Sequence, residues 1–176
     1  MGSVKPRDER TDYRGLLYSI VMADPWLYPF IYLIYSSQGA TLDDLRSMTG
    51  LRTQLVKRAL WWLLKSGVVE EAGGRYYVSR GFARHVEELR LSTCITGGVY
   101  IIQLGDAYIV VSLGEGRVSH WAVHRELYDK LLELERNAGA SFTGREVSQA
   151  LSIDVGTATR LVRLRELLRE CWRQGG

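Results

Sequence analysis

One segment of the chain carries the cations that could bind phosphate. Residues 41–80 contain seven Lys or Arg against four Asp or Glu, whereas residues 1–40, 81–125 and 126–176 each balance to zero. The formal net charge of +3 therefore arises from a single stretch. A local excess of this kind is typical of a protein face that meets the phosphates of a nucleic acid.

Most of these cations fall on one side of a helix that the sequence predicts over residues 51–66. At 100° per residue, one face of this helix is an apolar arc of Leu55, Val56, Ala59, Leu60 and Leu63. The opposite face collects Gln54, Lys57, Arg58, Trp61 and Lys65. We expect Lys57, Arg58 and Lys65 to bind phosphate.

The two adjacent tryptophans of this helix are predicted to have opposite roles. Trp61 falls among the basic residues, where its indole could lie against a sugar or a base. The alternative for Trp61 is packing under the following hairpin or against a partner subunit. Trp62 points with Leu51 and Leu55 into the domain, so Trp62→Ala is predicted to cost roughly 3–5 kcal/mol.

Further candidate contacts flank the basic face. Arg52, Thr53 and Gln54 lie near the start of the helix, and the first turns of a recognition helix are the part that enters the major groove. Arg46 precedes them, and Arg75 lies at the tip of a predicted hairpin, where it could contact phosphate or the minor groove. Alternatively, these basic side chains form a solvated face, and Arg75 is a surface arginine without a role.

Capping and turn signals predict the elements around this helix. Thr41, with Asp44 three residues later, is an acidic variant of the capping box and starts a helix. Thr49 and Gly50 form the turn that leads into the basic helix. Residues 68–78 then read as a short hairpin with a glycine-rich turn.

An apolar helix is predicted ahead of these elements. Asp24 is expected to cap it, with Pro25 at its first position, and the helix should run to about Ser37. Apolar residues occupy every side of this helix, so it has no polar face. They include Trp26, Phe30, Ile31 and Ile34. Such a helix must be covered on every side, so we expect a second subunit to bury part of it in a homodimer.

The order helix, helix, turn, helix, hairpin is that of a winged helix. The segment LRTQLVKRALWWLLKSGVVEEAGGRYYVS resembles the recognition helix and wing of bacterial and archaeal MarR-, ArsR- or PadR-type regulators. The next segment, SRGFARHVEELR, is similar to the helix that often follows the wing in such regulators. The resemblance covers residues 25–90 and implies a protein that binds double-stranded DNA as a homodimer, either a transcriptional regulator or a chromatin-associated factor.

The rest of the chain completes an α+β organisation. Residues 1–12 are predicted to be a flexible N-terminus, and residues 13–92 form the winged-helix domain. Residues 93–124 contain three apolar runs that predict a three-stranded antiparallel meander with both faces covered. Residues 125–174 are predicted to form a second, helix-turn-helix-like domain.

A weak internal repeat supports that second domain. Placing Thr143 on Thr41 aligns two capping signals at an offset of 102 residues. The last helix interleaves arginines, Arg165 among them, with Glu166 and Glu170, which favours a salt-bridged outer face over a phosphate-binding one. Its apolar stripe would suit the central sheet, a second subunit or another protein partner, and comprises Ala158, Leu161, Leu164, Leu168 and Trp172.

The sequence contains no motif that is typical of a catalytic site or a metal site. No nucleophile motif, phosphate loop or paired carboxylates are evident, so we expect neither an enzyme nor a cofactor. The two cysteines and three histidines do not have the spacing of metal ligands. They are Cys94, Cys171, His85, His120 and His124. Two reduced, buried thiols are predicted, with a disulfide expected only in a hyperthermophile. The single asparagine points toward a thermophilic source. The resemblance to bacterial and archaeal regulators makes an archaeal source an expectation.

Residues 15–35 have the length of a membrane span but are interrupted by Asp24, Pro25 and Pro29. We therefore expect a soluble core, no membrane partner, and a cytoplasmic, nucleoid-associated protein.

Two other functions remain open. A tandem winged-helix scaffold for protein partners, like the condensin-associated segregation proteins or ESCRT-II subunits, would use the C-terminal half. A single-strand-binding protein would use Trp61, Tyr76 and Tyr77 to stack bases.

Overall fold

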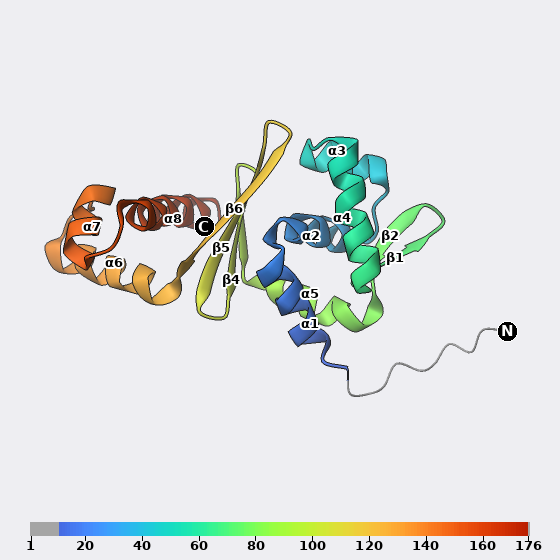
Figure 1. Cartoon of the computed structure of the whole chain (residues 1–176), viewed down its shortest axis with the longest axis horizontal. Helices are drawn as coiled ribbons and strands as arrows, with labels where there is room; N and C mark the ends of the chain where they lie inside the picture. The colour runs from blue at the N-terminus through green and yellow to red at the C-terminus, as the bar shows by residue number, and fades with distance from the viewer. Residues whose placement is uncertain (1–10, 176) are drawn as a thin grey trace.

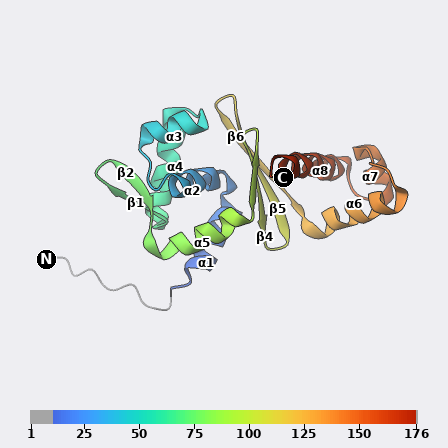
Figure 2. The ribbon, with the colours of Figure 1, turned by 180° about the vertical axis from the view of Figure 1, so that it is seen from behind.

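The computed structural model describes residues 11–175 and is an α+β structure. Within these residues, a four-stranded antiparallel sheet stands between two groups of helices (Figure 1, and from behind Figure 2). The N-terminal group contains α1 (Tyr13–Ala23), the 3-10 helix η1 (Pro25–Leu27), α2 (Tyr28–Ser36), α3 (Leu42–Thr49), α4 (Thr53–Ser66) and α5 (Arg80–Leu91). The C-terminal group contains α6 (Arg125–Ala138), α7 (Gly144–Leu151) and α8 (Val155–Gln174).

The central sheet separates two apolar cores. Its strands lie in the order β3 (Thr93–Thr96), β4 (Val99–Leu104), β5 (Ala107–Gly114) and β6 (Arg117–His124). Successive side chains of a strand point to opposite faces, so Ile102 joins the N-terminal core while its neighbour Ile101 joins the C-terminal core. The predicted cover on both faces is confirmed. The predicted count of three strands is wrong, because the short β3 follows α5 almost directly and is recognisable only by its pairing with β4.

A hairpin follows α4, as predicted. Strands β1 (Val69–Ala72) and β2 (Arg75–Val78) pair across a two-residue turn, Gly73-Gly74, in which both glycines have positive φ. Such a turn matches the twist of a hairpin, and its φ values suit glycine. Ahead of α3, Ala40 forms an isolated bridge to Tyr76 with N–H to O distances of 3.0 and 2.8 Å. The three-stranded sheet of a winged helix is therefore not formed, and the sheet here has two strands and one bridge.

The apolar segment from Pro25 onward differs from the single helix that the sequence predicts. It divides into η1 and α2, and the Asp24 side chain makes no capping hydrogen bond. The division follows from Pro29, whose nitrogen has no hydrogen to donate to the Pro25 carbonyl four residues earlier. The Tyr28 N–H bonds to that carbonyl instead, in 3-10 fashion.

The same chain covers this apolar segment. Phe30, Ile31 and Ile34 are fully buried, and they belong to one core with Tyr100 and Ile102 of the sheet. The ring of Tyr32 adds an edge-to-face contact with Tyr100, at 5.6 Å between centroids. The argument that α2 needs a second subunit is therefore wrong, because the sheet supplies the cover. A homodimer stays a prediction without that support.

The C-terminal helices repeat the helix-turn-helix geometry of α3 and α4 at a constant offset in the sequence. Helices α3 and α7 both have eight residues and both begin with a capping box, formed by Thr41 and Asp44 in one and by Thr143 and Glu146 in the other. Each helix ends on a residue in the left-handed region, and each following helix starts three residues later. The internal repeat at an offset of 102 residues is thus confirmed over the two helix-turn-helix units.

A disulfide joins the sheet to the end of α8. Cys94 of β3 and Cys171 of α8 are bonded, with 6.1 Å between their Cα atoms. The prediction of two reduced thiols is wrong, because the sheet and α8 bring together two cysteines that lie 77 residues apart in the sequence.

The flexible N-terminus predicted for residues 1–12 lies mostly outside the described residues. Asp12, which is described, caps α1 by accepting a hydrogen bond from the Gly15 N–H at 2.9 Å. In residues 11–175, no single helix is both long and apolar enough to cross a membrane, and the one pair that passes together, α1 with η1–α2, is bent by 108°.

Candidate nucleic-acid interface

Local interactions fix the geometry of the unit formed by α3, the turn and α4. The Thr41 N–H donates to Asp44 at 3.0 Å, and the Asp44 N–H donates to the Thr41 hydroxyl at 3.1 Å. These contacts hold the pKa of the Asp44 carboxyl below its ordinary value. Gly50 closes α3 with a φ of 67°, a value that costs little in glycine. Leu45 and the inner face of α4 are buried in the N-terminal core.

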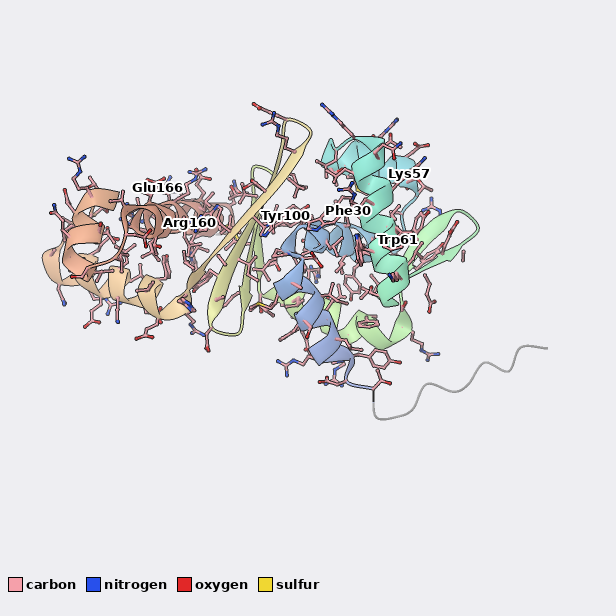
Figure 3. The ribbon with its side chains drawn as sticks, viewed as in Figure 1. Phe30, Lys57, Trp61, Tyr100, Arg160 and Glu166 are labelled. Carbon is pink, nitrogen blue, oxygen red and sulfur yellow. A yellow bond between two sulfur atoms is a disulfide. The ribbon has the colours of Figure 1, made fainter. Side chains whose placement is uncertain are left out.

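The outer face of α4 carries cations with no internal partner. Within residues 11–175, no ion pair involves Arg46 of α3, Arg52 at the cap of α4, or Lys57 and Arg58 on α4, and all four are exposed. Helix α4 contains no acidic residue. Figure 3 labels Lys57 on this helix, which lies on the side of the molecule away from the central sheet. These cations can meet phosphate without breaking an existing ion pair.

Two neighbours of these cations complete the first turn of α4. Gln54 is exposed, whereas Thr53 is half-buried. Both residues precede Lys57 on the same helix, so the structure brings the predicted base-contacting residues and the predicted phosphate-binding residues onto one element.

The end of α4 carries an aromatic cluster with a cation above it. The indoles of Trp61 and Trp62 meet edge to face, with 4.9 Å between centroids. The Lys65 Nζ lies 4.7 Å from the Trp61 ring and 5.4 Å from the Trp62 ring. At an exposed site such a contact is worth about 0.5–1 kcal/mol, so it biases Lys65 toward the rings.

The placement of Trp62 in the core is wrong. Its side chain is 44% exposed, close to the 54% of Trp61. At 100° per residue, Trp62 lies roughly 110° from the middle of the buried arc, which is the edge of the helix's apolar face. Whether a side chain at that edge is buried depends on the element packed beside it. Here Trp62 lines an open apolar groove with Leu16 and Ile20 of α1.

Replacing Trp61 or Trp62 singly with alanine is expected to lower the free energy of unfolding by only about 1–2 kcal/mol. The larger cost of about 3–5 kcal/mol applies to rings that are fully buried, such as Phe30. Thermal melts of the two variants beside Phe30→Ala measure the difference. A Trp62→Ala loss as large as that of Phe30→Ala would contradict the exposed placement.

The hairpin presents its arginine differently from the sequence-based expectation. Arg75 is the first residue after the turn, and its Nη1 donates to the Gly39 carbonyl at 3.4 Å and lies 3.9 Å from the Asp44 carboxylate. Glu70 and Glu71 of β1 are exposed. Arg75 is therefore directed back toward the start of α3 and is not grouped with the free cations of α4.

The matching surface on the second helix-turn-helix has fewer free cations. The offset places Arg160 where α4 has Arg58, and Asp154 where α4 has Arg52. Arg163 forms an ion pair with Glu166 at 3.6 Å, as the salt-bridged interpretation predicts. The inner stripe of α8 packs on the central sheet, although Trp172 at its end is exposed.

One residue of the predicted outer face of α8 is buried instead. Arg165 is 5% exposed and pairs with Glu135 of α6, which is 8% exposed. Its assignment to the salt-bridged surface is wrong. The repeat contained the necessary signal, because Arg165 aligns with Leu63, a core residue of α4, and a cation at a core position requires a buried partner.

Histidine and carboxylate clusters offer no additional site among the described residues. No group of three or more His, Cys, Asp or Glu side chains there could hold a metal ion. His120 and His124 lie on β6, as the sequence predicts, and both are exposed.

Comparison with protein-family models, with curated proteins and with solved structures finds no match for this chain.

Proposed function

We propose that the protein binds double-stranded DNA through α3 and α4. The observation that carries this proposal is a set of exposed cations on an acid-free α4 and at its cap, Arg52, Lys57 and Arg58, none of which forms an ion pair within residues 11–175. The chain's excess positive charge lies in the same segment. Cations that are free of internal partners bind phosphate and release counterions, which is the main source of affinity in DNA binding.

The proposed contacts follow from position along α4. Thr53 and Gln54 would approach base edges, because the start of a recognition helix is the part that enters the major groove. Lys57 and Arg58 would contact the flanking phosphates, with Arg46 on the neighbouring helix. Trp61 would lie against the sugar-phosphate backbone at the far end of the helix. The hairpin after α4 supports a winged-helix assignment for this unit, although two strands and the Ala40 bridge stand here in place of the three-stranded sheet of that fold.

The hairpin contributes less to this proposal than α4. Arg75 is held by Gly39 and Asp44, and the carboxylates of Glu70 and Glu71 would repel phosphate. We therefore assign affinity to α3 and α4, and any role of the hairpin to orientation. Transcriptional regulation or chromatin association would follow from duplex binding.

A salt titration tests the proposal. Affinity is measured for random duplex DNA, single-stranded DNA and RNA between 50 and 200 mM salt. With about four phosphate contacts, the plot of log affinity against log salt for duplex DNA should fall with a slope of about −3.5. Absence of duplex binding at 50 mM salt would reject the proposal, and tighter binding of single strands would favour base stacking on Trp61, Tyr76 and Tyr77.

A specific observation also favours a second candidate, a scaffold for protein partners. Two exposed apolar side chains, Leu16 of α1 and Trp62 of α4, line the groove between these helices. Tryptophan is enriched where proteins meet. Binding to no nucleic acid at low salt would leave this candidate in place.

A further inference from the structure

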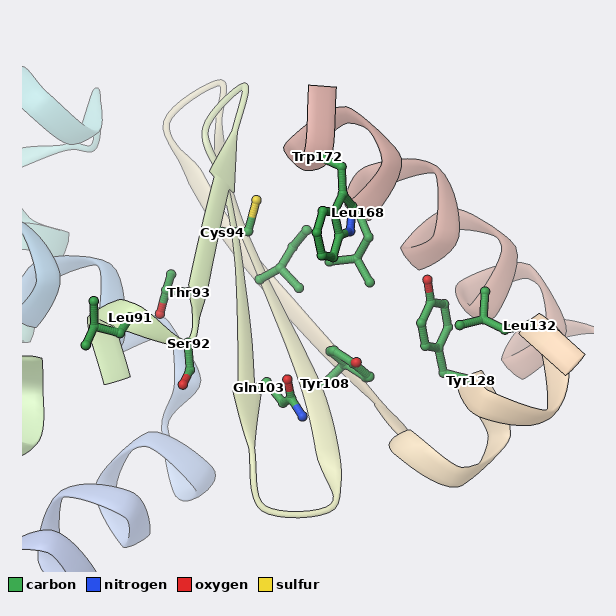
Figure 4. Close-up of a pocket in the computed structure, with 11 residues that line it drawn as sticks. Leu91, Ser92, Thr93, Cys94, Gln103, Tyr108, Tyr128, Leu132, Leu168 and Trp172 are labelled. Carbon is green, nitrogen blue, oxygen red and sulfur yellow. The ribbon is translucent and has the colours of Figure 1, made fainter. Parts of the chain in front are cut away.

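A second candidate site lies on the other side of the molecule from α4. A cavity of about 360 Å³ opens between the central sheet and helices α6 and α8. Figure 4 shows Trp172 and Leu168 of α8, Tyr128 and Leu132 of α6, and Gln103 and Tyr108 of the sheet around it. Its volume is within the range of small-molecule pockets.

Three of the side chains that line this cavity are aromatic, namely Tyr108, Tyr128 and Trp172. The rings of Tyr108 and Tyr128 meet edge to face, with 5.2 Å between centroids. Trp172 is 78% exposed at the edge of the cavity, although it is one of the largest apolar side chains in the protein. Rings on several sides of a narrow space favour a flat partner.

Polar groups in the cavity have no partner within residues 11–175. Tyr128 is only 6% exposed, yet its hydroxyl makes no hydrogen bond there. The Tyr108 hydroxyl and the Gln103 carboxamide also lack partners among the described residues. Most of the Tyr128 side chain is covered, but its hydroxyl oxygen stays reachable from the cavity, so it can donate a hydrogen bond to a ligand bound there.

The cavity also favours an uncharged ligand. None of its lining side chains carries a formal charge. Burial raises the pKa of Tyr128 to about 12, so this hydroxyl stays a neutral donor at ordinary pH. A charged ligand would lose hydration there without gaining an opposite charge from the lining side chains, and the nearby charges of Arg165 and Glu135 neutralise each other in an ion pair.

We propose that this cavity binds a small, uncharged, planar aromatic molecule that accepts a hydrogen bond from Tyr128. The three aromatic side chains would enclose the ring of the ligand, and Gln103 and Tyr108 would provide further donors and acceptors. The disulfide supports this geometry, because Cys171 precedes Trp172 and its bond to Cys94 fixes the end of α8 to β3. This site is independent of the proposed DNA interface.

Three probes that share a naphthalene ring and differ in charge test the proposal. These are 2-naphthol, 2-naphthoate and 2-naphthylmethylammonium, with affinities measured by calorimetry on the full chain at pH 7. We expect 2-naphthol to bind at least about tenfold more tightly than either ion, since no lining side chain supplies a counter-charge to either ion. Equal affinities for the three probes, or no binding of 2-naphthol at millimolar concentration, would overturn the proposal.

Variants locate the binding site. Tyr128→Phe keeps the ring and removes the hydroxyl, so it should weaken 2-naphthol binding by about fivefold. Trp172→Ala should also weaken binding without affecting folding, because Trp172 is largely exposed. Tyr77→Phe removes a hydroxyl from the remote hairpin and should leave the affinity unchanged. Unchanged binding in both Tyr128→Phe and Trp172→Ala would place the probe elsewhere and reject this cavity.

Discussion

Changing Lys57 and Arg58 together to alanine is expected to weaken duplex binding by roughly thirtyfold at 0.15 M salt. Each phosphate contact releases about 0.9 of a counterion, so loss of two contacts should reduce the salt slope by about two units. Both side chains are exposed and lack ion pairs within the described residues, so the melting temperature should stay near that of the original protein. Binding isotherms at several salt concentrations measure both quantities.

A second double variant separates position from net charge. Arg160→Ala with Arg163→Ala also removes two exposed arginines, but from the face of α8 that matches the outer face of α4. If α4 is the interface, this control should retain most of the affinity and the slope. Equal losses in the two variants would mean that overall charge, and not the α4 face, determines binding.

Glu135→Ala is expected to destabilise the C-terminal half by about 3–5 kcal/mol. Glu135 accepts hydrogen bonds from the Arg165 guanidinium and from the Phe142 N–H, the latter at 2.7 Å. Without the carboxylate, the one acceptor left to Arg165 among residues 11–175 would be the Phe142 carbonyl, at 3.1 Å, while the guanidinium stays buried. Removing one partner of a buried ion pair leaves an uncompensated charge, which accounts for the size of the loss. Urea unfolding measures it.

Two controls define what this loss means. Glu166→Ala breaks the exposed pair with Arg163 and should cost less than about 1 kcal/mol. Glu135→Leu combined with Arg165→Met replaces both charges by apolar groups and should recover much of the stability lost in Glu135→Ala. A Glu135→Ala loss no larger than that of Glu166→Ala would show that the pair is solvated.

Features encoded by neighbouring residues were predictable from the sequence. Thr41 and Asp44 lie within one helical turn, and so do Thr143 and Glu146, so both capping boxes could be read directly. The hairpin turn at Gly73-Gly74 is equally local. The candidate basic residues on α4 were also predictable, because one helical period assigns each of them to a face.

Features that depend on distant partners were not predictable in the same way. Strand β3 is defined by its pairing with β4, and the disulfide by the approach of α8 to that strand. Trp62 lies at the edge of an apolar arc, where contact with α1 and not helical period sets its exposure. Tyr128 lines a cavity that exists only once α6, α8 and the sheet are assembled, and no spacing rule marks its free hydroxyl.

The sheet that serves both cores limits how this protein could be dissected or recombined. A fragment ending at residue 92 would keep α1 to α5 but would lose Tyr100 and Ile102, which belong to the core that buries Phe30. A fragment beginning at residue 125 would lose Ile101 and Val110 from the other core. Neither helix-turn-helix could therefore be transferred to another protein as an independently folding unit. Any such transfer would have to include the central sheet, β3 to β6.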